Sequence, residues 1–200
     1  SSVTDNTGGY GAALYASAGK VFLVNSTIAD NHAYEGGALY IEGTANVEPR
    51  GMSFIDNHAD TNGGAAYVKS GIFGGDGGTY FGFNQANRGG AIYADIAADV
   101  TMIHGSFEFN RAETHGGAVF CPGGLLGGSL YFLANEALSG GAIYGTNVRL
   151  GLSLNTFKSN RAVTNGGAVL VSGPSWFDYV KFEDNSAGMH GGAMDVSSDI

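Results

Sequence analysis

The chain has 200 residues, 44% of them hydrophobic, which is enough for one domain with a sizeable core. It contains 35 glycines but only 3 prolines, which excludes collagen and a proline-rich disordered chain. The formal net charge of −9 argues against nucleic-acid binding. The chain has no apolar run of about 18 residues, so the sequence predicts no membrane-spanning helix.

A Gly-Gly-Ala-aliphatic block recurs eight times along the chain, the first copy being a variant with one glycine. Counted at the second position, the copies are 24 to 27 residues apart. They are 11–14, 36–39, 63–66, 89–92, 116–119, 140–143, 166–169 and 191–194. Such a period predicts a repeat protein, in which each unit buries its apolar face against its neighbours.

A second motif, an apolar residue followed three positions later by asparagine, precedes each block. Its asparagines are Asn6, Asn31, Asn57, Asn84, Asn110, Asn135, Asn160 and Asn185. We predict that they form one internal ladder, in which each amide hydrogen-bonds its own turn and the asparagine one turn away. A ligand-binding column is the alternative. The apolar residue, phenylalanine in most copies, is expected to fill the core.

After each glycine pair, aliphatic side chains alternate with aromatic or polar ones, with a period of two residues. Leu39 and Ile41 alternate with Tyr40 and Glu42, which predicts a strand with one buried face and one solvent-facing face. Glycine turns and the period near 26 residues then predict an all-β chain, a right-handed parallel β-helix (solenoid) of about eight three-sided coils. We expect residues 1–200 to be a single domain and, because the chain opens within a repeat, a segment of a longer protein.

The solvent-facing side of these strands is predicted to carry an exposed aromatic stripe, formed by Tyr15, Tyr40, Tyr67, Tyr93, Phe120 and Tyr144. The alanine of each block, from Ala13 to Ala193, is expected to run beside it on the same face. We interpret the stripe as a candidate surface for binding a partner, with stacking that only stabilises the sheet as the alternative. The first glycine of each pair is expected at a corner closed to other residues. The second is expected to leave space for the phenylalanine ring.

Enzymes on β-helices need clustered aspartates, or an Asp/Arg/Lys set, on one face of a sheet. Here the carboxylates follow turn positions, so we expect no catalytic residue, no cofactor and no metal site. Asp30 and Asp56 are expected to stack one coil apart, as are His32 and His58, and the four offer a weak cation site, for which a solvated turn is the favoured alternative. The single cysteine, Cys121, is predicted to be a small core residue.

The pairing of Gly89-Gly90-Ala91-Ile92 with the motif Phe81 to Asn84 resembles the repeat of the chlamydial polymorphic membrane proteins. The pairing of Gly140-Gly141-Ala142-Ile143 with Phe132 to Asn135 repeats the resemblance. It implies a β-helical autotransporter passenger, displayed outside the outer membrane and used for adhesion to host cells.

We therefore expect an extracellular, cell-surface rod that acts as an adhesin-like binding domain and is not an enzyme. Its expected partner is a protein or glycan on a surface, or another copy joined end to end, with no nucleic acid and no direct membrane insertion. The alternatives are a structural subunit of an extracellular filament or appendage and, less favoured, a polysaccharide lyase or hydrolase.

Overall fold

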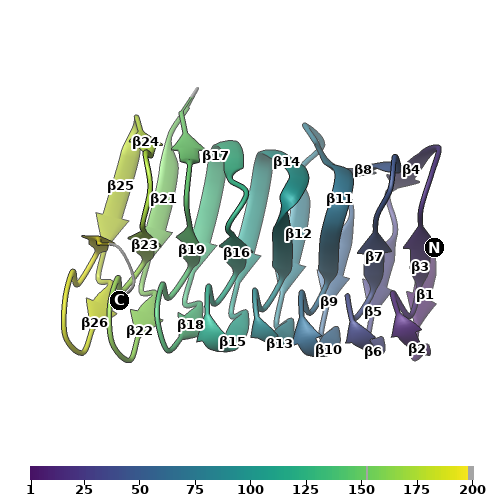
Figure 1. The fold of residues 1–200 in the computed structure, drawn as a ribbon, viewed down its shortest axis with the longest axis horizontal. Coiled ribbons are helices and arrows are strands. Elements are labelled where there is room, and N and C mark those ends of the chain that lie inside the picture. Colours follow the sequence, from purple (N-terminus) through teal and green to yellow (C-terminus); the bar gives the residue numbers. More distant parts are fainter. Residues whose placement is uncertain (152, 198–200) are drawn as a thin grey trace.

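The computed structural model describes residues 1–151 and 153–197, which form a parallel β-solenoid of 27 strands (Figure 1). The described residues contain no helix, and so none that is long and apolar enough to cross a membrane. The solenoid has about seven turns rather than the expected eight coils, because eight copies of a motif enclose seven complete intervals. The all-β solenoid class predicted from the sequence is thereby confirmed.

Each turn supplies strand segments to four rows rather than to the three sides that were expected. The first row holds the apolar residue of the asparagine motif and contains β1 (Ser2–Thr4), β5 (Thr27–Ala29), β9 (Ser53–Ile55), β12 (Thr79–Gly82), β21 (Asn155–Lys158) and β25 (Val180–Glu183). The second follows the asparagines and contains β2 (Thr7–Tyr10), β6 (His32–Glu35), β10 (His58–Asn62), β13 (Gln85–Arg88), β15 (Arg111–His115), β18 (Glu136–Ala137), β22 (Arg161–Ala162) and β26 (Ser186–Ala187).

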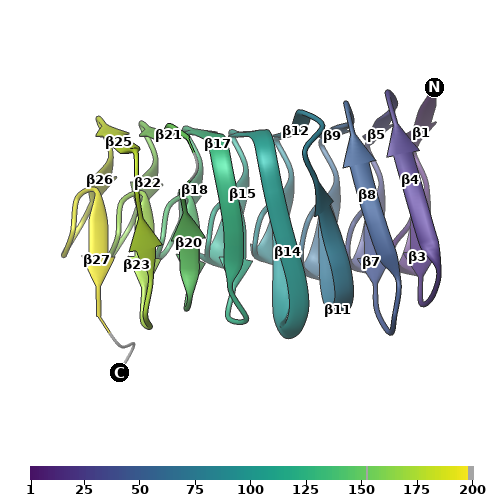
Figure 2. The same cartoon turned by 90° about the horizontal axis from the view of Figure 1, so that it is seen from above.

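The third row follows the glycine pairs and contains β3 (Leu14–Ala16), β7 (Leu39–Ile41), β16 (Val119–Cys121), β19 (Ile143–Gly145), β23 (Val169–Val171) and β27 (Met194–Val196). The fourth contains β4 (Lys20–Val24), β8 (Asn46–Arg50), β20 (Val148–Leu150) and β24 (Trp176–Phe177). Three longer strands run through more than one of these rows: β11 (Ala66–Gly75), β14 (Ile92–Glu108) and β17 (Leu125–Leu133). Figure 2 shows strands of the fourth row side by side along the rod.

Parallel pairing stacks equivalent residues of successive turns directly on one another. Phe81 is in register with Phe54 on one side and Phe107 on the other. The rings of Phe81 and Phe107 lie parallel with centroids 4.7 Å apart, and Phe132 and Phe157 repeat this stacking at 4.6 Å. These rings are fully buried. The prediction that the residue three positions before the asparagine fills the core is confirmed for the six inner copies, whereas Val3 in the first turn is exposed and Phe182 in the last is half-buried.

Two corner positions in each turn have a left-handed backbone. The first glycine of every pair has φ between 55° and 65°, so the expectation of a corner conformation closed to most residues is confirmed. The residue before every ladder asparagine has φ between 51° and 60°. Aspartate, which tolerates this region, occupies four of those positions, but Phe109 and Ala134 are among the others and are strained there.

The second glycine of each pair has a different role from the one expected. A Cβ atom at Gly117 would lie 2.1 Å from the carbonyl oxygen of Gly141 and 2.7 Å from the backbone nitrogen of Glu136. Both atoms belong to the next turn. The second glycine therefore lets two backbones approach each other, and the expectation that it makes room for the phenylalanine ring is wrong.

The alanine after each glycine pair is also placed differently from the prediction. Ala38, Ala65 and Ala91 are fully buried in the main core instead of lying on the outer face. The reason is local. The backbone nitrogens of Ala38 and Leu39 both donate to the carbonyl oxygen of Ala65, at 3.1 and 2.8 Å, so the alternation of faces starts only after the alanine.

Candidate functional site

The eight ladder asparagines lie in one continuous column through the rod. The side-chain nitrogen of each donates to the side-chain oxygen of the next, at 2.9 to 3.0 Å along the whole column. The two terminal members, Asn6 and Asn185, are half-buried, and the other six are buried.

Asn110 shows how completely a mid-rod amide is used. Its nitrogen donates to the oxygen of Asn135 and to the carbonyl of Phe81, both at 3.0 Å. Its oxygen accepts from the backbone and side-chain nitrogens of Asn84, again at 3.0 Å. A primary amide offers two donor hydrogens and two acceptor lone pairs, so all four positions are occupied. The geometry supports the structural role of the column and leaves this amide no capacity to bind a ligand.

The predicted aromatic stripe forms one column of contacting rings, some stacked and some edge-to-face, on the face of the sheet opposite the main core. Tyr40, Tyr67 and Tyr93 form a hydrophobic cluster of their own, against which Phe120 packs. The rings follow one another with centroids 4.9 to 5.5 Å apart from Tyr15 to Tyr144.

Exposure of the stripe differs from the prediction. Tyr15 is exposed, but Tyr40, Tyr67 and Tyr93 are at most 7% exposed, and Phe120 and Tyr144 are half-buried. Burial is the main cause that raises the pKa of Tyr67 well above its ordinary value, and the negative charge of Asp95 adds to it. The expectation of an exposed stripe is therefore wrong for most of its members.

The residues that precede the glycine pairs cover the stripe. The Arg88 guanidinium lies 5.3 Å from the ring centre of Tyr93, and the His115 ring lies 4.7 Å from that of Tyr144. Tyr10, at the same position of the first turn, packs edge-on against Tyr40 at 5.0 Å. Because the chain bends sharply at the glycines, outward side chains on either side of the bend meet and exclude water.

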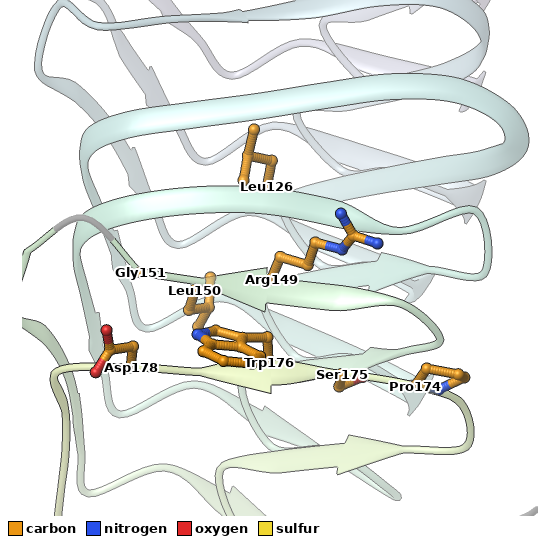
Figure 3. A pocket seen from close by; sticks show the side chains of 8 residues that line it. All are labelled: Leu126, Arg149, Leu150, Gly151, Pro174, Ser175, Trp176 and Asp178. Carbon is orange, nitrogen blue, oxygen red and sulfur yellow. The ribbon is translucent and has the colours of Figure 1, made fainter.

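A shallow pocket of about 620 Å³ lies elsewhere on the outer surface, around Trp176 of β24 (Figure 3). We call it the Trp176 groove. Its lining residues are Leu126, Arg149, Leu150, Gly151, Pro174, Ser175, Trp176 and Asp178. Register explains their meeting, because Leu126 of β17 pairs with Arg149 of β20, which pairs with Trp176. One outward position in three successive turns thus supplies a leucine, an arginine and a tryptophan.

The Trp176 groove combines an exposed aromatic ring with charged groups. Trp176 is 67% exposed, and in Figure 3 its indole lies along the strand with Asp178 at one end and Ser175 at the other. Arg149 is exposed and makes no ion pair within the described residues. A second hollow of about 430 Å³ shares Leu126 and Arg149 with the groove.

Sequence reasoning missed the Trp176 groove. The lone tryptophan of the chain was the available signal, but the lining comes from the fourth row, where the turns differ most in length and carry no motif.

The two histidines expected in equivalent positions of successive turns are in register, and the rings of His32 and His58 meet edge-on with centroids 4.9 Å apart. The carboxylate beside them is Asp60, however, and not Asp30 or Asp56. Asp60 lies two residues after His58 on β10 and so points to the same side of the strand. Asp30 and Asp56 lie before the ladder asparagines, where the backbone turns.

Cys121 lies in the core, as predicted. The side chain is fully buried, and burial raises the pKa of its thiol to about 12. A thiol held neutral in this way is not a nucleophile.

Comparison with known proteins identifies one segment of the chain. Residues 51–69 match the model of the Chlamydia polymorphic membrane protein repeat, and this segment contains Phe54, Asn57 and the glycine pair at Gly63 and Gly64. Searches of curated proteins and of solved structures found no match. The chain thus carries, at residues 51–69, a repeat of the polymorphic membrane protein type within a β-solenoid, as the resemblance of its motifs indicated.

Proposed function

We propose that this chain is a surface-displayed, autotransporter passenger-like domain that acts as an adhesin by binding a glycan in the Trp176 groove. The repeat at residues 51–69 and the solenoid support the passenger-like role, because the matching family is one of membrane proteins with this repeat. A rod built of stacked turns presents long, rigid sides, which suit binding at a cell surface.

The observation that carries the proposal is the exposed indole of Trp176 beside the charged groups of Arg149 and Asp178. A sugar ring has a face of C–H groups, which packs against an aromatic ring, and an edge of hydroxyls, which needs donors and acceptors. Arg149 supplies donors and Asp178 supplies acceptors at the rim of the same groove. These side chains lie on or next to paired strands, so little backbone conformational entropy would be lost on binding.

Charge and composition narrow the ligand further. The net charge of −9 opposes binding of a polyanionic chain, so a neutral glycan is the better fit. The described lining of the Trp176 groove contains one carboxylate, Asp178, whereas glycoside hydrolysis generally uses a pair. We therefore propose that the domain binds its glycan without cleaving it.

The test is a screen of the full 200-residue chain on an array of neutral glycans, followed by calorimetric titration of the best saccharide. Trp176→Ala should weaken binding at least tenfold and leave the thermal unfolding temperature unchanged. Tyr34→Ala is the matched control, because Tyr34 is also exposed (54%) but lies on β6, outside the groove. The proposal fails if no saccharide binds, if only a protein partner binds, or if the two variants bind alike.

A further inference from the structure

Two histidines and an aspartate converge on the outer face of the second row. His32 and His58 are the first residues of β6 and β10, and the two are in register. Asp60 follows on β10. Each of the three side chains is about half exposed, at 52%, 50% and 51%, so solvent and ions reach the cluster freely. In Figure 1 the two strands lie side by side near the N-terminal end of the rod.

The ligand atoms of this cluster are close enough together to hold a metal ion. The Asp60 Oδ1 atom is 2.8 Å from Nε2 of His32 and 3.7 Å from Nε2 of His58, and all three ligand atoms lie within 4.8 Å of one another. Two atoms bound tetrahedrally to zinc at about 2.0–2.1 Å are about 3.3 Å apart. The two distances to Asp60 bracket that value, and the two histidine nitrogens lie within 4.8 Å of each other, so rotations of the side chains can bring all three atoms around one ion.

The ligand types select the class of ion. Imidazole nitrogen favours zinc, copper, nickel and iron, whereas calcium and magnesium prefer sites made entirely of oxygen. Two imidazoles and one carboxylate are a common ligand set for zinc, with the fourth position left to water or to a group from another molecule.

The backbone holds the cluster in place without a metal. Strand β10 pairs with β6 on one side and with β13 on the other, and this pairing puts His58 in direct register with His32. Asp60 lies on the same strand, between Ala59 and Asn62, where the register shifts. A hollow of about 260 Å³ adjoins His58 and Asp60, and Gln85 and Glu113 line it. Such neighbours can orient the metal ligands or a bound water.

We propose that His32, His58 and Asp60 form a binding site for a single divalent transition metal ion of the zinc class. The site lies in the second row, apart from the Trp176 groove in the fourth, and its existence does not depend on the glycan-binding function. The other description of the cluster is an exposed ion pair between histidine and aspartate, which would bind no metal. The two descriptions differ in a measurement on the protein alone.

The experiment uses the full chain without a histidine tag, stripped of metal with a chelator and then titrated with zinc chloride against a chromophoric zinc indicator. We expect one zinc ion per chain, no displacement by a large excess of magnesium, and a visible spectrum typical of nitrogen and oxygen ligands when cobalt replaces zinc. His32→Asn and His58→Asn should each weaken zinc binding at least tenfold.

His104→Asn is the matched control, because His104 is exposed but lies outside the cluster, and asparagine tolerates its left-handed backbone (φ 55°). Thermal unfolding of each metal-free variant checks that the fold is kept. Wild-type protein that binds no zinc at micromolar concentration would overturn the proposal. Equal zinc affinities of His32→Asn, His58→Asn and His104→Asn would overturn it as well.

Discussion

Replacing Asn110 with alanine removes an amide that makes four hydrogen bonds in the middle of the rod. The backbone nitrogen of Asn84 loses its acceptor, and the side-chain nitrogen of Asn84 loses one of its two. The carbonyl of Phe81 and the oxygen of Asn135 each lose a donor.

The cost follows from the burial of these groups. Asn84 and Asn110 are at most 1% exposed, so water cannot replace the lost partners without entering the core. An unsatisfied buried donor or acceptor costs about 1–3 kcal/mol. With two donors left short of an acceptor, we expect Asn110→Ala to lower the free energy of unfolding by about 4 kcal/mol. This is a large share of the roughly 5–15 kcal/mol that holds an ordinary domain folded.

Equilibrium unfolding in urea, followed by circular dichroism, measures the effect. With a slope of about 2–3 kcal/mol per molar urea, the midpoint should fall by about 1.5 M. Asn6→Ala is the control, because the Asn6 side chain only donates, to Thr4 and Asn31, and lies in the half-buried first turn. A loss below about 1 kcal/mol for Asn110→Ala, or a loss equal to that of Asn6→Ala, would refute the reasoning.

Three further substitutions test other parts of the structure by the same urea assay. Gly117→Ala should lower the free energy of unfolding by about 3 kcal/mol or more, because its Cβ atom would lie 2.1 Å from the carbonyl oxygen of Gly141. Gly9→Ala is the control and should cost little, because no atom lies within 4 Å of a Cβ there. Equal losses of stability in the two variants would contradict the tight approach of the two backbones. Ala134→Gly should raise stability by about 1 kcal/mol, because φ is 51° at this position; a loss of stability would argue against strain there. Tyr67→Ser should lower the free energy of unfolding by about 3 kcal/mol, because Tyr67 is only 7% exposed. Tyr15→Ser should cost under about 0.5 kcal/mol, because Tyr15 is 50% exposed. A small effect at Tyr67 would mean that the aromatic stripe is not packed.

The repeat alone determined the class of fold, the stacked phenylalanines and the internal column of asparagines. In a solenoid with a regular period, equivalent residues of successive turns must lie on top of one another. A motif that recurs at the same offset therefore becomes a column, and the chemistry of one member applies to all. An amide in such a column finds its partner in the next amide, which is why Asn6 to Asn185 could be assigned from spacing.

Burial at the corners was decided only by the tertiary structure. Alternation correctly placed Tyr40, Tyr67 and Tyr93 on the face opposite the main core. It could not reveal that the chain bends at the glycines so that side chains such as Arg88 cover that face. The same bend lets one carbonyl accept two backbone hydrogen bonds, which places the alanines inside.

The two candidate binding sites also depend on the tertiary structure, for a related reason. The fourth row varies in length from turn to turn, so the register of Leu126, Arg149 and Trp176 cannot be counted from a motif. The spacing did place His32 above His58. Which carboxylate joins them depends on where the turn ends and β10 begins, since only a residue on the strand itself points the same way as the imidazoles.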